Sequence, residues 1–595
     1  MTLATERAKI GRKPITLVEC DLDKCTLSYG VAPCTASLAA GFECYNTRKT
    51  CQDPANYTLG TKTYRFAENK GNLPADMGAI PCVKNVSLTP TRIDPAKGLG
   101  YLASVTVEMI DMPHHDRGID PYISTRSFSP RGSFFGKLNA RNPYYKGRTL
   151  RVMSGYISER DYKLSLYKTP FPYSTPLPYQ GITSRDRSPI YDAANFETRE
   201  YIIEKFEGPD SSGRVKITAK DILSKTNADK AQAPFISSGS LSAAITISDT
   251  SLTLQTGEGA DYSTSGEVRI GDEIITYTGV TADTLTGLTR GAWNSVADAH
   301  DADSNVQQCV SWTVTNVVDV IYDLLVNYAD IDPGYINTTD WNAEKISALS
   351  PFDVTAIITK PEGVKKLISE LCQQSLSYVW WDERTQKIRL KSISPYTFDT
   401  ELRDSINFID VNVKDVPDDR ISRMHVYYDI FDRVNPDKEE SYKSVYVFAD
   451  LESELATKHG EKKIKVIKSR WYQAQGPVAQ NASRRVLWLR ETPKRAMFKL
   501  DAKDGALWTG DPIDLISASV QDVTGATKPL EMFIIEATEN RDGTFDYIAM
   551  DNPFSGRFGV VMADGTGDFA GANKGGWIAL DSGLFSDGSE AFKII

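Results

Sequence analysis

The sequence predicts a mainly β protein with α+β parts, divided into several domains. The chain has 595 residues, and an ordinary domain size of about 100 to 200 residues implies roughly three to five domains. Short runs of alternating apolar and polar residues, such as "YLASVTVEMI" and "GRVKITAKDI", recur between Gly, Pro and Asp and are typical of strands. Two stretches with helical spacing of apolar residues add the α+β part.

Composition and charge argue against two classes of protein. Apolar residues make up 41% of the chain and charged residues 25%, as in ordinary globular proteins. No run of about 18 apolar residues could form a membrane-spanning helix, so we expect no stable membrane insertion. The formal net charge of −10 argues against tight binding of nucleic acid, although it is compatible with DNA that only slides past. The amino terminus has no apolar signal segment, so we expect folding in a reducing cytosol.

Residues 1–82 are predicted to form a loop-rich, cysteine-rich module. Four of the eight cysteines, Cys25, Cys34, Cys44 and Cys51, follow the spacing C-x8-C-x9-C-x6-C. Thiols this close together either form disulfides or bind a metal, and a reducing compartment favours the metal. The lack of a C-x2-C pair weakens a zinc site, whereas an iron–sulfur cluster tolerates wider loops. The spacing alone leaves metal, disulfides and buried free thiols open.

The other cysteines have weaker links to such a site. Cys20 lies five residues before Cys25, whereas Cys82 lies far beyond the group, so Cys20 is the better substitute ligand. Cys309 and Cys372 have apolar neighbours. A free cysteine in such a place usually packs as a small apolar side chain, so we expect both in hydrophobic cores.

The rest of the chain divides where its composition and pattern change. A Ser-, Thr-, Gly- and Ala-rich stretch that still alternates predicts a small inserted β domain, and the Gly- and Asp-rich end predicts an extended arm. The predicted units are a first β-rich domain (83–236), the inserted small β domain (237–309), an α+β segment (310–400), a second β-rich domain (401–555) and a Gly-rich C-terminal arm (556–595).

Two amphipathic helices and a hairpin define the α+β segment. "TNVVDVIYDLLVNYADI" and "GVKKLISELCQQSL" both place apolar residues at helical spacing. The second helix leads into "SYVWWDERTQKIRLKSI", whose polar centre between alternating arms predicts a hairpin. A further helix is expected around "VAQNASRRVLWLRE", within the second β-rich domain.

Candidate catalytic residues are few. His114, His115 and Asp116 in "MPHHDRG" could suggest a metal or acid–base site. Adjacent residues of a strand face opposite ways, however, and no nearby His or Cys completes such a site, so we prefer a polar turn. Common catalytic motifs are not found in a convincing context, and no enzymatic function is predicted.

Aromatic residues of the inserted domain suggest a second candidate site. Trp293, Tyr277 and His300 could form a sugar-binding platform. An aromatic side chain in a Gly-rich turn more often fills a core, and that interpretation is preferred.

A basic segment suggests a third candidate. "KHGEKKIKVIKSR" places Lys463, Lys465 and Ile467 on one face of a predicted strand. The preferred interpretation is a solvated face or ion pairs between subunits, and the alternative is weak contact with DNA passing through a tube.

Several stretches together resemble tail-tip proteins of tailed phages and prophages. They are "DLDKCTLSYGVAPCTA", "CYNTRKTCQDPANY", "LTPTRIDPAKGLGYLASVTVEMIDMPHHDRGIDPYIS", "GKLNARNPYYKGRTLRVMSGYI" and "FEGPDSSGRVKITAKDIL". The likeness extends to about residue 375. The cysteine-rich part is similar to the cluster-binding domain of lambda-type iron–sulfur tail-tip proteins and of gene-transfer-agent hub proteins. The inserted domain resembles a small β module that recurs in phage tail proteins.

This resemblance implies a cofactor, an assembly and a set of partners. It implies a 4Fe–4S cluster with ligands Cys25, Cys34, Cys44 and Cys51. It also implies a homotrimeric ring at the distal tail tip of the virion, assembled in the cytoplasm of the bacterial host, in which each copy contributes two β-barrel-like tube domains. The expected neighbours are the distal tail or tail tube protein above, a central fibre or tip attachment protein below and the tape measure protein, with DNA passing transiently through the lumen.

The function predicted from the sequence is therefore that of a structural hub in the tail tip. Two alternatives come from other classes. One is an enzyme used in entering the host, either a redox protein that uses the cluster or a cell-wall hydrolase. The other is an adhesin whose inserted domain binds surface glycans.

Overall fold

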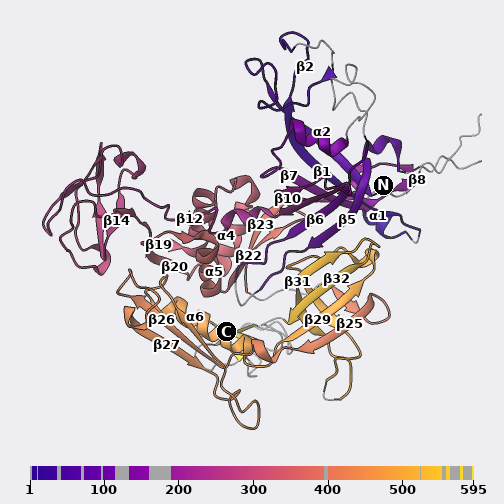
Figure 1. Cartoon of the computed structure of the whole chain (residues 1–595). Coiled ribbons are helices and arrows are strands. Elements are labelled where there is room, and N and C mark those ends of the chain that lie inside the picture. Colours follow the sequence, from indigo (N-terminus) through magenta and orange to yellow (C-terminus); the bar gives the residue numbers. More distant parts are fainter. Residues whose placement is uncertain are drawn as a thin grey trace, which may run out of the picture.

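Seven strands from the first part of the chain close into a barrel (Figure 1). The computed structural model describes residues 3–9, 11–36, 42–68, 73–94, 98–113, 133–159, 189–393, 400–522, 524–551, 558–562, 576–579 and 593–594. In barrel order the strands are β1 (Pro14–Cys25), β4 (Leu59–Glu68), β5 (Ile80–Thr89), β6 (Ser104–Ile110), β11 (Arg214–Lys220), β10 (Phe196–Glu207) and β7 (Thr149–Tyr156). The chain is mainly β, as predicted.

The barrel takes in part of the region predicted as a separate cysteine module. Strand β5 crosses the expected boundary between residues 82 and 83, and β1 pairs with both β4 and β7. Alternate residues of β1, namely Val18, Cys20 and Leu22, point into the barrel core. The segment between β1 and β4 leaves the barrel, with β2 (Ser28–Tyr29) and β3 (Phe42–Glu43) as its short strands. Figure 1 shows it projecting from one end of the barrel, beyond α2 (Phe134–Arg141).

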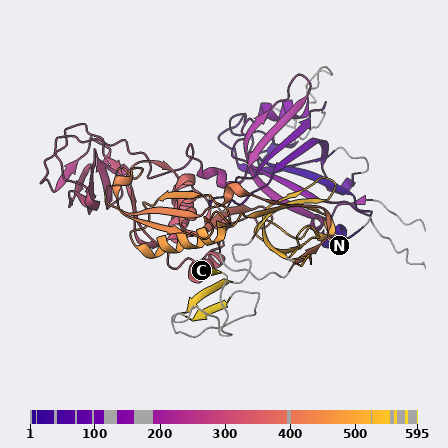
Figure 2. The same ribbon diagram turned by 90° about the horizontal axis from the view of Figure 1, so that it is seen from below.

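The inserted domain is a small β unit with a hydrophobic core of its own. Its strands form two three-stranded sheets, one of β13 (Ser251–Thr253), β17 (Thr284–Thr286) and β16 (Gly279–Thr281), the other of β15 (Glu273–Tyr277), β14 (Gly266–Ile270) and β18 (Gln307–Gln308). Figures 1 and 2 both show it at the opposite end of the molecule from the barrel.

The α+β segment lies between these ends and contains the largest core. The predicted amphipathic helices and hairpin are confirmed, because the first stretch forms α3 and a π-helical turn, the second forms α5, and β22 and β23 pair. Asn316 caps α3 by accepting a hydrogen bond from the backbone N–H of Val318. The elements are β12 (Gln232–Ala233), β19 (Val310–Asn316), α3 (Val317–Asp323), η7 (Leu324–Tyr328), α4 (Thr338–Ser347), β20 (Asp353–Ile358), β21 (Glu362–Gly363), α5 (Val364–Ser375), β22 (Ser377–Asp382) and β23 (Lys387–Ser392).

The structure divides the predicted second β-rich domain in two. One part is an open six-stranded sheet in the order β24 (Glu401–Arg403), β30 (Pro512–Ile516), β31 (Leu530–Glu539), β32 (Phe545–Asp551), β29 (Lys494–Leu500) and β25 (Phe408–Asp415). The other comprises β26 (Arg423–Ile430), β27 (Tyr442–Ala449), β28 (Ile464–Lys468) and α6 (Gln475–Leu489). Met424, Val426 and Ile467 of this second part join the core of the α+β segment. The predicted helix is thus present, and it packs on β26 and β27 and also against α5 of the α+β segment.

Two further groups of elements complete the described chain. Helix α1 (Leu3–Arg7) precedes the barrel, and β8 (Ser158–Glu159) pairs with β9 (Pro189–Ile190). The predicted C-terminal arm is described only at β33 (Phe558–Met562), β34 (Gly576–Ala579) and β35 (Lys593–Ile594), which form a small sheet. Figure 2 shows this sheet, in yellow, below the rest of the chain.

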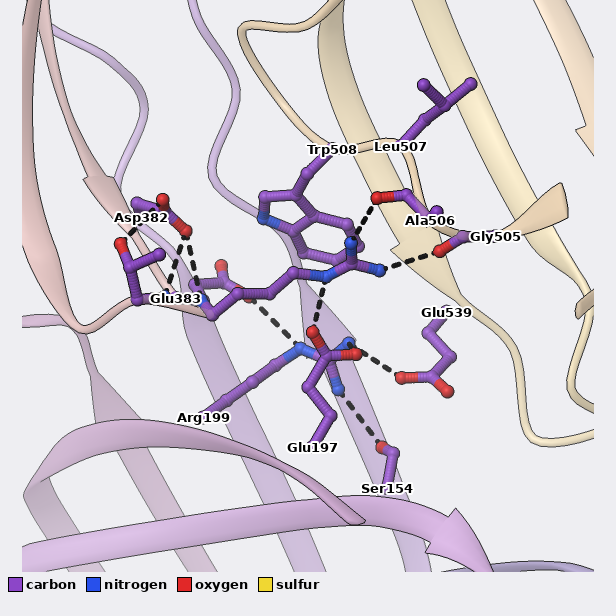
Figure 3. A network of polar contacts seen from close by, with 12 residues as sticks. Ser154, Glu197, Arg199, Asp382, Glu383, Gly505, Ala506, Leu507, Trp508 and Glu539 are labelled. Atoms are coloured by element: carbon purple, nitrogen blue, oxygen red, sulfur yellow. Dashed lines mark hydrogen bonds and ion pairs between the residues drawn. The ribbon is translucent and has the colours of Figure 1, made fainter. Parts of the chain in front are cut away.

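A buried network of charges joins the barrel to the six-stranded sheet (Figure 3). Arg199 of β10 donates to Glu539 of β31 at 2.7 Å and to Ser154 of β7 at 3.1 Å. The guanidinium groups of Arg199 and Arg384 lie 5.2 and 4.0 Å from the ring of Trp508. Fully paired buried charges of this kind fix the position of one domain against another. None of the helices in the described ranges is both long and apolar enough to cross a membrane.

Candidate metal centre

The cysteine segment (residues 25–58) starts where β1 leaves the barrel. Cys25 is the last residue of β1 and pairs with Leu59 of β4. Its backbone N–H donates to the carbonyl oxygen of Asn46 at 3.1 Å, so the first cysteine is tied to the loop that carries the third. The barrel therefore provides a rigid base for an otherwise loop-rich segment.

The structure brings Cys25, Cys34, Cys44 and Cys51 around one cavity. Cys25 and Cys44 are buried, Cys34 and Cys51 are half-buried, and all eight cysteines of the chain are free thiols. The apolar side chains around the thiols are few, chiefly Tyr29 together with the partly buried Leu27, Ala36 and Tyr57. The predicted ligands thus meet in space, in a region with little apolar core.

Burial and the neighbouring thiols raise the pKa values of Cys44 and Cys51. Burial raises the pKa of Cys44 to about 11, and the neighbouring Cys25, Cys51 and Cys34 thiols contribute to the rise. The pKa of Cys51 is also raised, mainly by burial and further by Cys25 and Cys34. Since metals bind thiolates, a bound cationic centre would lower these pKa values and favour the deprotonated form.

Backbone N–H groups point at two of the sulfurs. The N–H of Asp53 donates to Cys51 Sγ at 3.4 Å, and the N–H of Asn46 donates to the Cys44 sulfur. In both cases the donor lies two residues after the cysteine. Hydrogen bonds of this kind stabilise thiolate charge and are one of the ways in which proteins tune iron–sulfur clusters.

The side chain of Asp53 links two of the cysteine loops. Its Oδ2 accepts from the backbone N–H of Thr35 at 2.8 Å, from the Thr35 hydroxyl at 2.9 Å and from Asn56 Nδ2 at 2.9 Å. Thr35 follows Cys34, and Asp53 lies two residues after Cys51. Sequence reasoning missed this residue, although an Asp followed by Pro is a recognisable turn signal.

The segment is also fastened to α2. The hydroxyl groups of Thr47 and Thr50 both donate to the carbonyl oxygen of Arg141, at 3.1 and 2.9 Å. Asn142 Nδ2 donates to the carbonyl oxygen of Asp23 at 3.0 Å. The loop between Cys44 and Cys51 is therefore held by the end of a helix that packs on the barrel.

The four thiols surround a shared cavity and do not meet at one point. In the described ranges no three His, Cys, Asp or Glu side chains lie close enough together to hold one metal ion, yet the four cysteines line one cavity and act on each other electrostatically. A single zinc ion needs all its sulfurs about 2.3 Å from one point. A four-iron cluster is larger and binds each thiolate to a different iron, so it suits thiols that surround a shared space at greater separation.

The remaining cysteines lie outside this site. Cys20, considered above as a substitute ligand, points into the barrel core, as does Cys82, and burial raises the pKa of each to about 12. Cys309 and Cys372 are buried among apolar side chains, as predicted.

Of the two other candidate groups, one lies outside the described residues and the other is dispersed. His114, His115 and Asp116 lie outside the described residues. In the inserted domain Tyr277 is buried in the core, while Trp293 lies under the guanidinium of Arg433 at 4.6 Å. His300 Nε2 lies 2.7 Å from the buried carboxylate of Glu273. These three residues therefore do not form a common sugar-binding surface.

The basic strand presents an apolar face to solvent. Ile467 is buried and Lys465 is half-buried on the same side of β28, while Ile464 and Val466 on the other side are exposed. Lys465 thus lies on the inner side of the sheet and not on its exposed face.

Comparison with known proteins gives only weak similarities. Neither a protein-family profile nor a curated protein sequence matches the chain. Among solved structures, a 43 kDa tail protein of prophage MuSo2 from Shewanella oneidensis is 9% identical, with 79% of this chain and 98% of that chain covered and a TM-score of 0.36. A tail protein from Neisseria meningitidis is 11% identical, with 78% and 95% covered and a TM-score of 0.35. A chain of a native gene transfer agent virion is 10% identical, with 54% and 84% covered and a TM-score of 0.27. At these values the likeness does not establish a family.

Proposed function

We propose that the chain is a structural hub protein of a phage tail tip and that Cys25, Cys34, Cys44 and Cys51 hold a 4Fe–4S cluster. The tail assignment rests on the sequence stretches that resemble tail-tip proteins. The cluster assignment rests on one observation, namely that four thiols from separate loops line one cavity. The proposed role is structural and involves no enzymatic turnover.

The cluster would act as a cross-link within the cysteine segment. When bound, it supplies cationic irons that hold the four thiolates together. The chain itself contributes the backbone N–H groups of Asn46 and Asp53, which donate to two of the sulfurs. It also contributes the Asp53 carboxylate, which keeps the Cys34 and Cys51 loops in place.

Iron analysis tests the cluster. Full-length protein purified without oxygen should be brown, absorb broadly toward the blue and contain about four irons per chain. Serine at any of the four cysteines should lower the iron content, whereas Cys372→Ser should not. Colourless protein, or protein with one zinc per chain, would overturn the assignment.

An exposed apolar sheet face supports a role in an assembly. Val447 and Val466 lie on either side of His425 in the paired strands β27, β26 and β28. Both valines, and their neighbours Val445 and Ile464, are about half exposed, between 47% and 53%. Several exposed apolar side chains on one sheet face often mark an interface, and we propose that a second copy of the chain covers this face in a trimeric ring in the virion.

Light scattering tests this assembly. Purified chain should form a species with three copies, and Val466→Lys should shift it toward the monomer, because a charge would be buried in the interface. Val314→Lys, at an exposed position outside this sheet, serves as the control. A closed dimer or hexamer would contradict the proposed ring.

A further inference from the structure

A second cavity lies where the three large parts of the chain meet. Its volume is about 320 Å³. The lining includes Arg92 and Asp94 from the loop after β5, Lys465 from β28, Trp488 from the end of α6 and Arg495 from β29. It therefore belongs to the barrel, the α+β core and the six-stranded sheet together.

Four side chains of this lining have a buried N–H group without an acceptor in the part of the chain that the structure describes. The groups are Arg92 Nε, Arg420 Nη1, Trp488 Nε1 and Arg495 Nε. A buried donor without a partner is destabilising, so native proteins rarely leave several together. Their concentration at one cavity indicates that something supplies acceptors there.

Buried cations around the cavity outnumber the carboxylates that could pair with them. Arg420 and Lys465 line the cavity, the first buried and the second half-buried, and the buried Arg485 lies close to Lys465 but outside the lining. Within the described ranges none of the three lies within ion-pair distance of an Asp or Glu. Arg420 donates to the carbonyl oxygen of Glu461 at 2.6 Å, and Arg485 donates to that of Gln373 at 2.5 Å. Carbonyl oxygens satisfy a donor but do not neutralise a charge.

Three carboxylates line the cavity and oppose an anion. Asp419 accepts from Arg495 Nη2 at 2.6 Å, and Asp418 is exposed to solvent. Asp94 is close enough to act electrostatically on both Lys465 and Arg485. Because Arg420 has no ion-pair partner among the described residues, positive charge is in excess around the cavity.

The lowered pKa values of Lys465 and Arg485 agree with an excess of positive charge. The pKa of Lys465 is lowered by burial and by the nearby Arg485. The pKa of Arg485 is lowered to about 10, again mainly by burial. Arg485 is still charged at neutral pH, and uncompensated buried charge is strongly destabilising.

We propose that this cavity binds a phosphate-type oxyanion. Such an ion accepts several hydrogen bonds at once and carries up to two negative charges near pH 7. A single carboxylate carries only one negative charge, which is less than the excess of positive charge around the cavity. Guanidinium and ammonium groups are the usual protein partners of phosphate.

The response of the full-length chain to inorganic phosphate tests this site. Phosphate, but not acetate at the same ionic strength, should raise the midpoint of thermal unfolding and give a saturable heat of binding. Lys465→Met keeps the aliphatic stem and removes the charge. It should weaken phosphate binding about tenfold or more, the effect of losing one charge-assisted hydrogen bond. Without phosphate the same variant should be at least as stable as the wild type, because an unpaired cation has been removed.

Two control variants test whether the effect of Lys465→Met is specific to the cavity. Lys443→Met removes a lysine from the same three-stranded sheet, outside the cavity lining, and should leave phosphate binding unchanged. Trp488→Phe removes only one donor and should have a smaller effect than Lys465→Met. The proposal fails if phosphate does not stabilise the wild type, if acetate stabilises it equally, or if Lys465→Met responds as the wild type does.

Discussion

The cysteine segment and the inserted domain are both small β excursions from a larger domain, but they are held together differently. The inserted domain surrounds a core of eleven buried apolar side chains. The described part of the cysteine segment has a cluster of three buried residues, two of which are the thiols Cys25 and Cys44. Apolar burial can therefore account for the stability of the inserted domain but not for that of the cysteine segment.

The two regions differ in how much free energy apolar burial contributes to their folding. Burying one large aliphatic side chain contributes about 1.5–3 kcal/mol, so the inserted domain can offset the entropy of ordering its chain. A segment with so little apolar burial needs disulfides or a metal to fold. Structural zinc supplies about 10–16 kcal/mol in small peptides, and we expect a cluster to act in the same sense here.

The largest effect should come from removing the metal. Cys44→Ser, or iron chelation of the wild type, should abolish hydrogen-exchange protection in most of the cysteine segment, because the hydrogen bonds that remain between its loops are supported by little apolar burial. The inserted domain should keep its protection. Protease should then cut between residues 26 and 57 and spare the barrel. If the segment stays protected without iron, the contrast between the two regions is wrong.

The converse experiment damages the apolar core. Ile270 is fully buried in the inserted domain, and Ile270→Ala should destabilise that domain by about 2–5 kcal/mol. Hydrogen exchange should rise there while the iron content stays the same. Ile247→Ala, at a 59% exposed position of the same domain, should change little. Loss of iron in Ile270→Ala would show that the two regions are coupled.

Acid should affect the inserted domain through Glu273. This carboxylate is buried, which by itself would raise its pKa, but hydrogen bonds from Arg290 and His300 lower the pKa overall. A carboxyl group with a lowered pKa stabilises the fold above its unfolded pKa, and that contribution is lost as the pH falls through the folded value. Glu273→Gln should cost about 1–3 kcal/mol at pH 7 and flatten the loss of stability below about pH 4.5. An unchanged acid profile would contradict this role.

Local sequence patterns predicted most elements and few of their packing partners. The helical spacing of α5 and the alternation of the β22–β23 hairpin depend only on neighbouring residues, so both were predictable. Met424 and Val426 alternate like the residues of any strand. Nothing near them indicates that their partners are helices rather than another sheet, which is why one β-rich domain was predicted where the structure has two parts.

The same limit applies to the sites. The spacing of four cysteines indicated that they could meet, whereas Cys20 could have been set aside, because it alternates with Val18 and Leu22 on a strand that faces a core. No local sequence pattern indicates the cavity around Arg420 and Lys465, since its lining comes from segments hundreds of residues apart.

The smallest effect we expect is that of Asp53→Ala on the rate of iron loss. This variant tests how far polar contacts between the loops help to retain the cluster. Asp53→Ala removes three hydrogen bonds that join the Cys34 and Cys51 loops and leaves all four thiols in place. Iron should be lost to a chelator about tenfold faster, as is typical when a residue that positions metal ligands is removed. Asp522→Ala is the matched control, because Asp522 also accepts three hydrogen bonds, from Thr524 N, Thr524 Oγ1 and Ala526 N, in a turn of the six-stranded sheet that contains no cysteine. Equal rates of iron loss in the two variants would mean that the thiols and the barrel alone position the cluster.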